Sequence, residues 1–248
     1  MKVLLSLLLL TALLFSTNIS FLNSKKELRK IYQGHQTTIY CDCKYNYQDK
    51  KNMIDRKSCG YKPRNERTKK GNINQRARRI EWEHLIPSEN FGRQFSCWRD
   101  GNSKCVNKKG KLYKGRKCCA KVNKKYKLMQ ADMHNLFLSV GELNADRKNF
   151  RFDFEAGKSG QYGACEFNVL FKQKRVRVRE NIRGVIARDY LYFNKYHKMK
   201  LSKQELKKFT SWNKQYPPNA WEIERNKKIT KIQGNSNEFI KVRRTNNI

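Results

Sequence analysis

The sequence is poor in acidic residues: 21 Asp and Glu stand against 56 Lys and Arg among 248 residues, so the formal net charge is +35. Such a surface concentrates polyanions around it and repels cationic partners, which favours nucleic acid or another acidic surface as the ligand. Proline is also scarce, with 4 residues, and no linker rich in glycine, serine or proline interrupts the chain. A single domain is therefore expected.

Long apolar runs are absent beyond the first 20 residues. Within residues 1–20, Lys2 precedes an apolar run from Val3 to Phe15, and small and polar residues follow. The run is shorter than the roughly 20 residues that span a bilayer, and its pattern is that of a secretory signal. We therefore expect a signal peptide over residues 1–20. The mature protein, residues 21–248, is expected to be periplasmic or secreted and not held in a membrane.

A disordered basic tail is excluded, because 13 Phe, 12 Tyr and 4 Trp provide the material for a hydrophobic core. The spacing of the apolar residues predicts helices over residues 185–198 and 203–215. Residues 24–40 are expected to form a short helix that leads into a strand at Thr37–Tyr40.

Eight cysteines are present, an even number that favours disulfides in an exported chain. They are Cys41, Cys43, Cys59, Cys97, Cys105, Cys118, Cys119 and Cys165. Zinc is the rival interpretation, but these spacings are not those of a zinc ribbon or finger, and no histidine stands at a ligand spacing beside them. Eight cysteines allow about a hundred pairings, so spacing alone leaves the connectivity open.

Three strongly basic runs cover residues 64–79, 108–127 and 172–183. Any one of them could be a solvated face. Three in one exported domain favour contact with phosphate groups.

The stretch from Arg79 to Pro87 predicts a strand that ends at the proline. It carries Glu83 beside His84, and both can face one site only if the strand bends there. The carboxylate offers a hard ligand for a divalent cation, and the imidazole offers a base with an unperturbed pKa of about 6.5. Phosphodiester hydrolysis requires this pairing, and activity would rise between about pH 6 and 7 if the pKa of His84 is near its unperturbed value. A structural role of the dipeptide stays open.

A second polar stretch spans residues 130–136. On a helix Asp132 and Asn135 share a face, so the amide oxygen of Asn135 could complete a hard metal site with Glu83. Water would fill the remaining positions, as magnesium prefers. For His134 the alternative is a hydrogen-bonded structural histidine.

These motifs stand among others that resemble one known family in type and order. They are Tyr40–Cys43, Ser58–Tyr61, Glu81–Pro87, Phe91-Gly92, Asp132–Leu136, Ser139–Glu142, Asn144, Asp146-Arg147, Asn149-Phe150, Gly160–Gly163, Arg183–Arg188, Trp212–Lys214 and Ile232–Asn235. The chain resembles the endonuclease I family, which comprises bacterial periplasmic or secreted non-specific DNA and RNA nucleases of the ββα-metal (His-Me finger) group.

The resemblance implies an α+β fold: a single domain built around a ββα-metal element, with additional helices and disulfide-linked loops. It implies that Glu83 and Asn135 ligate one magnesium ion and that His84 is the general base. The products would carry 5′-phosphate and 3′-hydroxyl ends. It also implies the disulfides Cys43–Cys59 and Cys41–Cys165, and it leaves the other four cysteines unassigned.

The chain departs from the family between Cys97 and Cys105. Relatives carry an arginine there that contacts the phosphate, whereas this loop is one residue shorter and has no arginine at the matching place. Lys104 is the nearest cation and is our candidate catalytic contact, although it lacks the planar fork of arginine. The expected partners are double- and single-stranded DNA and also RNA, bound by a monomer.

Two other functions stay open. One is a metal-free ribonuclease that uses His84 and His134 as an acid and base pair and needs a 2′-hydroxyl. The other is a non-catalytic basic protein that binds nucleic acid or an anionic surface through charge alone.

Overall fold

The computed structural model describes residues 20–46, 52–155, 157 and 160–241. The expected signal peptide lies outside these residues except for Ser20. This residue caps helix α1 (Phe21–Ile31), because its side chain accepts a hydrogen bond from the backbone N–H of Asn23 at 3.2 Å. The folded domain therefore includes Ser20, one residue before the expected boundary.

The centre of the molecule is an antiparallel pair of strands followed by a short helix. β3 (Ile80–His84) pairs with β4 (Leu136–Val140) along its whole length, and helix α6 (Gly141–Arg147) follows β4 directly. All five residues of β4 are buried. A side chain at Gly141 would place Cβ 2.8 Å from the carbonyl oxygen of Arg76 and 2.9 Å from the Glu81 carboxylate. Only glycine permits this close turn from β4 into α6.

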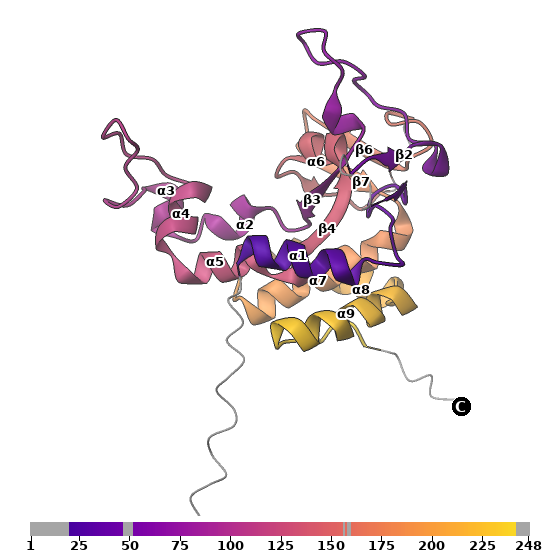
Figure 1. Cartoon of the computed structure of the whole chain (residues 1–248). Helices are drawn as coiled ribbons and strands as arrows, with labels where there is room; N and C mark the ends of the chain where they lie inside the picture. Colours follow the sequence, from indigo (N-terminus) through magenta and orange to yellow (C-terminus); the bar gives the residue numbers. More distant parts are fainter. Residues whose placement is uncertain (1–19, 47–51, 156, 158–159, 242–248) are drawn as a thin grey trace, which may run out of the picture.

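Two smaller sheets flank this unit in the described part of the chain (Figure 1). One pairs β1 (Lys44–Tyr45) with β2 (Ile54–Asp55). In the other, β7 (Arg175–Val178) lies between β5 (Arg151–Phe152), which is parallel to it, and β6 (Phe167–Leu170), which is antiparallel. The fold is thus a mixed α+β domain, as expected.

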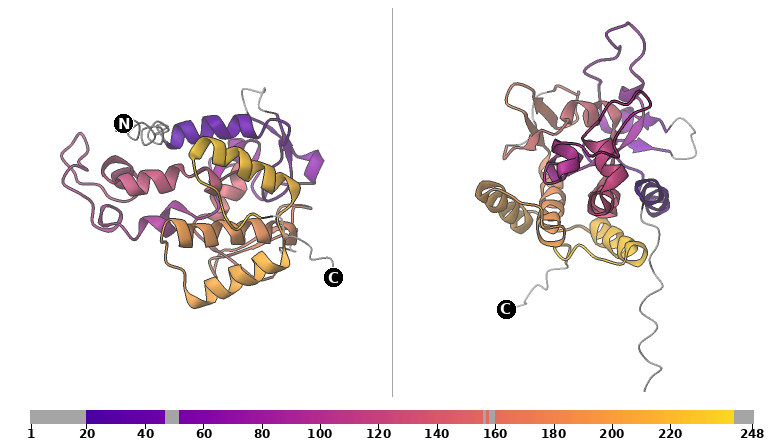
Figure 2. Two further views of the ribbon diagram at one scale, coloured as in Figure 1. Left: turned by 90° about the horizontal axis from the view of Figure 1, so that it is seen from below. Right: turned by 90° about the vertical axis from the view of Figure 1, so that its left-hand side faces the viewer.

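A layer of helices supports the strands from the opposite side (Figures 1 and 2). It contains α1, α5 (Lys124–Ala131), α7 (Arg183–Tyr196), α8 (Lys203–Gln215) and α9 (Ala220–Gln233). Tyr190 of α7 stacks on Phe209 of α8 with ring centroids 4.2 Å apart. The helices expected over 185–198 and 203–215 are therefore confirmed, and their aromatic side chains form core. Short 3-10 helices span Lys57–Cys59, Gln75–Ala77, Met133–Asn135 and Glu180–Ile182.

The strand expected at Thr37–Tyr40 does not form. Thr37 makes one isolated bridge with Lys44, and the chain turns after it. The reason lies in side chains that hold a turn: the Thr38 hydroxyl accepts from the backbone N–H of Cys43 at 3.0 Å, and the Tyr40 hydroxyl donates to Glu83 at 2.8 Å.

A disulfide-linked arm, residues 97–122, projects from the body (Figure 1). It contains most of α3 (Ser96–Arg99) and all of α4 (Arg116–Val122), and it adjoins α2 (Ser88–Gly92). Cys97–Cys119 and Cys105–Cys118 close it. The bridges Cys41–Cys165 and Cys43–Cys59, which the resemblance implied, are present in the body.

No helix of the described residues combines the length and the apolar character that a membrane span needs. The buried apolar residues of the described part of the chain form one extended hydrophobic core.

Candidate active site

A cavity of about 1090 Å³ opens beside the central strands. Glu83 and His84 of β3 line it, together with Asn144 of α6. Both neighbours on β3 reach one cavity because His84 is the last residue of the strand. The structure thus brings together the carboxylate and the imidazole that the sequence singled out.

The Glu83 carboxylate is held in a fixed orientation from one side. Its Oε1 atom accepts from the Tyr40 hydroxyl at 2.8 Å and from Nη1 of Arg147 at 3.2 Å. Oε2 has no hydrogen-bond donor among the described residues, and the side chain is 5% exposed. Burial raises the pKa of Glu83, while the positive charge of Arg147 and the hydrogen bond from Tyr40 oppose that rise. A cation at Oε2 would stabilise the ionised form further.

Arg147 connects this carboxylate to the backbone after it. Besides Glu83, its guanidinium donates to the main-chain oxygens of His84, at 3.0 Å, and of Leu85. The arginine is 1% exposed and lies 4.7 Å from the ring centre of Phe152. Arg147 therefore fixes the end of β3 and is already engaged within the protein.

The His84 ring is oriented by a single main-chain contact. Its Nε2 lies 2.9 Å from the carbonyl oxygen of Gln130, which can only accept, so Nε2 carries the proton and Nδ1 keeps the lone pair. Phe21 stacks on the other face, with ring centroids 5.2 Å apart. Burial lowers the pKa of His84 to about 3, and the charges of Arg116, Arg147 and Lys25 act in the same direction. This pKa is well below the unperturbed value of about 6.5, so the condition for a rise in activity between about pH 6 and 7 is not met, and the ring is neutral at physiological pH.

Asn144 also lines the cavity, although the sequence indicated no role for it. Its Nδ2 donates to the main-chain oxygen of Trp82 at 3.2 Å, which leaves the amide oxygen without a donor among the described residues. Asn144 stands one turn into α6, and this helix follows the strand that pairs with β3. The sequence signal for Asn144 was its place just after the apolar run of Leu136–Val140, where a buried strand passes into a helix.

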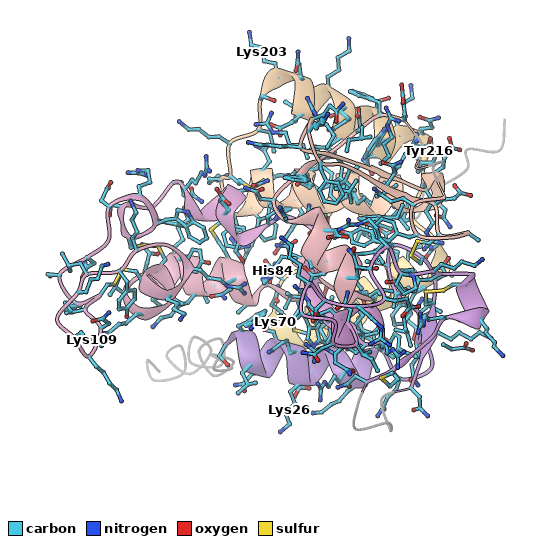
Figure 3. The ribbon with its side chains drawn as sticks, turned by 90° about the horizontal axis from the view of Figure 1, so that it is seen from above. Lys26, Lys70, His84, Lys109, Lys203 and Tyr216 are labelled. Atoms are coloured by element: carbon cyan, nitrogen blue, oxygen red, sulfur yellow. A yellow bond between two sulfur atoms is a disulfide. The ribbon has the colours of Figure 1, made fainter. Side chains whose placement is uncertain are left out.

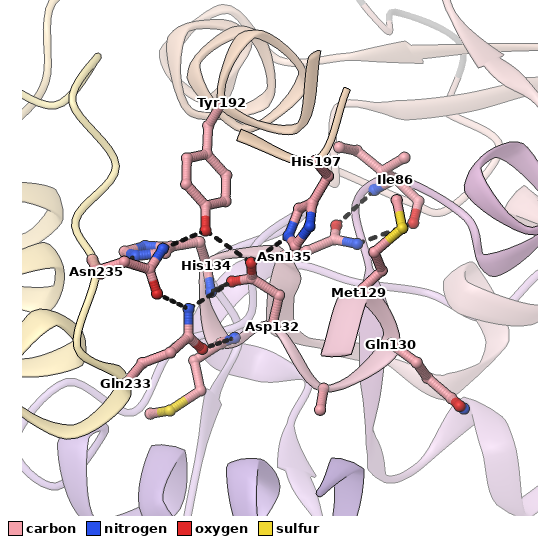
Figure 4. Close-up of polar contacts among 12 residues, drawn as sticks. Ile86, Met129, Gln130, Asp132, His134, Asn135, Tyr192, His197, Gln233 and Asn235 are labelled. Carbon is pink, nitrogen blue, oxygen red and sulfur yellow. Dashed lines mark hydrogen bonds and ion pairs between the residues drawn. The ribbon is translucent and has the colours of Figure 1, made fainter. Parts of the chain in front are cut away.

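Asn135 does not reach the cavity. Its side chain is fully buried and both amide atoms are used by one residue: the oxygen accepts from the backbone N–H of Ile86 at 2.7 Å, and the nitrogen donates to the Ile86 oxygen at 3.0 Å (Figure 4). Asn135 therefore clamps the chain just after His84. This position gives no geometric support to its expected role as a metal ligand.

The helix expected to place Asp132 and Asn135 on one face is also wrong. α5 ends at Ala131, because the Asp132 side chain accepts from the His134 backbone N–H at 3.0 Å and starts a separate 3-10 helix. The same carboxylate accepts from Tyr192 at 2.7 Å and contacts Nε2 of His197 at 2.6 Å (Figure 4).

His134 belongs to this buried network and does not line the cavity. Its Nε2 lies 3.0 Å from the main-chain oxygen of Asn235, and its Nδ1 is buried without a partner. The structural alternative for His134 is therefore the one the geometry supports, and an acid and base pair with His84 is not formed.

Lys104 lies in an exposed turn of the arm and is not part of the cavity wall. Its main-chain oxygen accepts from Nζ of Lys121 at 2.5 Å. The cavity is nevertheless cationic, and the basic residues that line it are Lys25, Arg76, Arg78, Arg79, Arg116, Arg147 and Lys148. An anionic ligand therefore fits this cavity without Lys104.

The donor set suits a hard divalent cation. Among the described residues no three His, Cys, Asp or Glu side chains gather in a way that could hold a metal. Glu83 and Asn144 instead offer one carboxylate oxygen and one amide oxygen on the cavity wall, both without donors. Oxygen ligands of this kind favour a hard divalent cation over zinc, whose structural sites use nitrogen and sulfur ligands.

Comparisons with known proteins identify the family of this chain. The sequence pattern of the endonuclease I family matches residues 18–243. An extracellular deoxyribonuclease of Aeromonas hydrophila is 43% identical over 222 residues, which cover 89% of this chain and 87% of that protein. A periplasmic deoxyribonuclease of the same species is 44% identical, with 87% and 83% covered. Endonuclease-1 of Buchnera aphidicola (subsp. Acyrthosiphon pisum) is 40% identical, with 85% and 76% covered. The chain therefore belongs to the endonuclease I family.

Proposed function

We propose that this member of the endonuclease I family is a periplasmic or secreted, magnesium-dependent endonuclease that hydrolyses DNA and RNA without sequence preference and leaves 5′-phosphate ends. The observation that carries the proposal is the meeting of His84, Glu83 and Asn144 on one cationic cavity. The relatives named as deoxyribonucleases support DNA as a substrate.

The proposed catalytic unit is β3, β4 and α6, which would form the ββα-metal element of the family. β3 supplies Glu83 and His84, and α6 supplies Asn144. Their order along the chain, two antiparallel strands followed at once by a helix, supports this assignment. We assign Asn144, and not Asn135, as the second metal ligand, because the Asn135 amide is engaged with Ile86.

Glu83 and Asn144 would hold one magnesium ion through their two free oxygens. When bound, the ion neutralises the phosphate and stabilises the departing 3′-oxygen. The protein prepares for this by fixing Glu83 with the Tyr40 hydroxyl and Arg147, so that the carboxylate does not reorganise when the substrate arrives.

His84 would act as the general base through Nδ1. The proton on Nε2 is committed to the Gln130 carbonyl, so the lone pair on Nδ1 remains available to a water molecule in the cavity. Because the ring is neutral at working pH, it accepts the proton of that water without first losing one of its own. Attack in line with the departing 3′-oxygen would leave the phosphate on the 5′ side.

Two exposed hairpins extend the basic surface outside the cavity. One bridges Arg67 with Ile73 and carries lysines at its tip; the other bridges Val106 with Leu112 on the arm. Figure 3 shows Lys109 at the far end of that arm. Their flexible lysine side chains would contact the phosphate backbone of the nucleic acid, and phosphate contacts carry no sequence information, which supports binding without sequence preference. We propose that the protein binds as a monomer.

Cleavage of a supercoiled plasmid and of a single-stranded RNA, each with magnesium or with a chelator, tests the proposal. Wild-type protein should nick and linearise the plasmid and degrade the RNA only with the metal, and Glu83→Gln should do neither while binding DNA normally. Cleavage of RNA alone, unaffected by chelator, would instead support a metal-free ribonuclease. Salt-sensitive binding without any strand breakage would support a non-catalytic protein.

A further inference from the structure

Most arginines that line the cavity are already engaged with other groups of the protein. Arg147 donates to Glu83 and to the main chain after it. Arg76 forms a two-point contact with Glu81, and Arg79 lies 3.2 Å from the same carboxylate. The charge of each of these arginines is therefore already balanced in part by a carboxylate, which weakens its attraction for a phosphate.

Arg116 is different. It is exposed to solvent on the cavity wall and forms no ion pair with an Asp or Glu of the described residues. Its guanidinium is nevertheless positioned: with the Gln130 amide oxygen turned toward it, that oxygen accepts from Nε and from Nη2, both at 2.9 Å. The guanidinium also lies 5.4 Å from the ring centre of Phe21. The edge of the guanidinium formed by Nε and Nη2 is thus anchored. Nη1 and the second proton of Nη2 remain for a ligand.

The anchors of Arg116 are also the anchors of the base. The main-chain oxygen of Gln130 orients His84, while its side chain orients Arg116. Phe21 stacks on the His84 ring and contacts the guanidinium. We propose that Arg116 is a catalytic residue whose guanidinium holds the scissile phosphate beside the His84 base. This inference rests on the proposed hydrolysis of phosphodiesters.

The disulfides of the arm place Arg116 at the cavity. It is the first residue of α4, and Cys118 and Cys119, two and three residues later, are bonded to Cys105 and Cys97. A short helix of seven residues would not hold its first side chain in place by its own stability. The two bridges supply the rigidity that a fixed phosphate contact needs.

Two other cations on the wall are weaker candidates. Lys25 is a single ammonium whose Nζ lies 4.6 Å from the centre of the Phe21 ring, and it lacks a fork that could grip two phosphate oxygens. Arg78 also has no carboxylate partner among the described residues, but it has neither of the contacts that Arg116 makes with Gln130 and Phe21, the residues beside the His84 ring. Among the described residues of the cavity wall, Arg116 combines the absence of a carboxylate partner with anchoring contacts beside the base.

The test uses the variants Arg116→Ala and Arg116→Lys, and two lysine variants serve as controls. Lys25→Ala removes a charge from the same cavity, and Lys227→Ala removes an exposed charge from α9. Single-turnover cleavage of a short duplex is measured with magnesium and excess protein. Duplex affinity is measured separately with chelator, and thermal unfolding checks the fold. Arg116→Ala should cleave at least about tenfold more slowly, with affinity within about threefold of wild type. Arg116→Lys should recover only part of the rate, because an ammonium cannot replace the fork.

Lys227→Ala should match wild type in rate, and Lys25→Ala should lose less than Arg116→Ala. Equal losses in Lys25→Ala and Arg116→Ala would overturn the inference, since the charge of the cavity would then be the cause. Normal cleavage by Arg116→Ala would overturn it too and leave the proposed function intact. If the wild-type protein cleaves neither DNA nor RNA, whether a divalent metal is present or absent, then both the proposed function and this inference fail.

Discussion

The imidazole of His84 is tied to the main chain of Gln130, with Nε2 2.9 Å from the carbonyl oxygen. The two residues are 46 positions apart, so the tautomer of the base is set by the tertiary fold and not by the motif around it. The side chain of the same glutamine anchors Arg116. One residue at the end of α5 thus positions two groups on the cavity wall.

His84 should titrate far below the usual range for histidine. Burial, together with the nearby charges of Arg116 and Arg147, lowers its pKa to about 3. A base works when it is unprotonated, so lowering the pH from 8 to 6 should not remove activity through this ring. NMR of the ring signals, assigned with His84→Gln, should show neutral His84 down to about pH 4 in the metal-free protein. Titration near pH 6.5 would contradict this.

Asn144→Ala should raise the magnesium concentration needed for half-maximal cleavage by about tenfold or more, because it removes one protein ligand and leaves Glu83 alone. The Asn144 amide nitrogen makes one 3.2 Å contact, with Trp82, so stability should change little. Cleavage rates across a magnesium titration and a thermal melt measure the two effects. An unchanged magnesium requirement would remove Asn144 from the site.

Asn135→Ala should behave in the opposite way. It leaves the buried N–H and carbonyl of Ile86 without partners, which costs about 1–3 kcal/mol of unfolding free energy for each unsatisfied group. The magnesium requirement of the folded fraction should stay at the wild-type value. Urea unfolding and a magnesium titration at low temperature provide the measurement, and Asn144→Ala is the matched control. A shifted magnesium requirement at full stability would restore Asn135 as a ligand.

Elements whose signal is local were predictable. The apolar spacing of Ile186, Tyr190 and Phe193 already indicated α7, because these residues share one buried face of the helix. The strand before Pro87 was predictable from the alternation of apolar and polar residues over Ile80–Glu83 and from the proline that follows, and β3 spans Ile80–His84.

The errors arise where a side chain overrides a local pattern. A helix through residues 130–136 was reasonable from spacing, but the Asp132 carboxylate is used from four sides and starts a new turn. The expectation that Asn135 is a metal ligand rested on that helix as well as on the family resemblance, and the Asn135 amide is engaged with Ile86. The sequence left the pairing of the four arm cysteines open, so the expectation for Lys104 could not take it into account. In the structure, this pairing brings α4 and Arg116 to the cavity.

Asp132 should contribute to acid stability. Burial alone would raise its pKa, but the hydrogen bond from His197 and further contacts from His134 and Gln233 lower it to about 2. A depressed carboxyl pKa contributes stability above the unfolded value of about 4, and this contribution is lost as the pH falls toward 2.

Asp132→Asn should therefore lower the unfolding free energy by about 2 kcal/mol at pH 7. Urea melts at pH 7, 4 and 2.5 should show the difference between the two proteins shrinking. A constant difference would assign the loss to packing.

The arm bridge Cys105–Cys118 should matter more for cleavage than for the stability of the body. It closes a separation of 13 residues, and the body bridge Cys43–Cys59 closes a similar one of 16. On chain entropy each contributes about 3 kcal/mol, so the double alanine variants should lose comparable stability within the segments they close. Of the two losses, only that of the arm bridge loosens the helix that begins at Arg116, which Cys97–Cys119 alone then holds. That variant should cleave at least about tenfold more slowly at a temperature where both variants are folded. Single-turnover cleavage, with near-ultraviolet circular dichroism as the check on folding, decides the point. Equal slowing of the two variants would mean that the bridges act through general stability and that the arm does not position a group at the cavity.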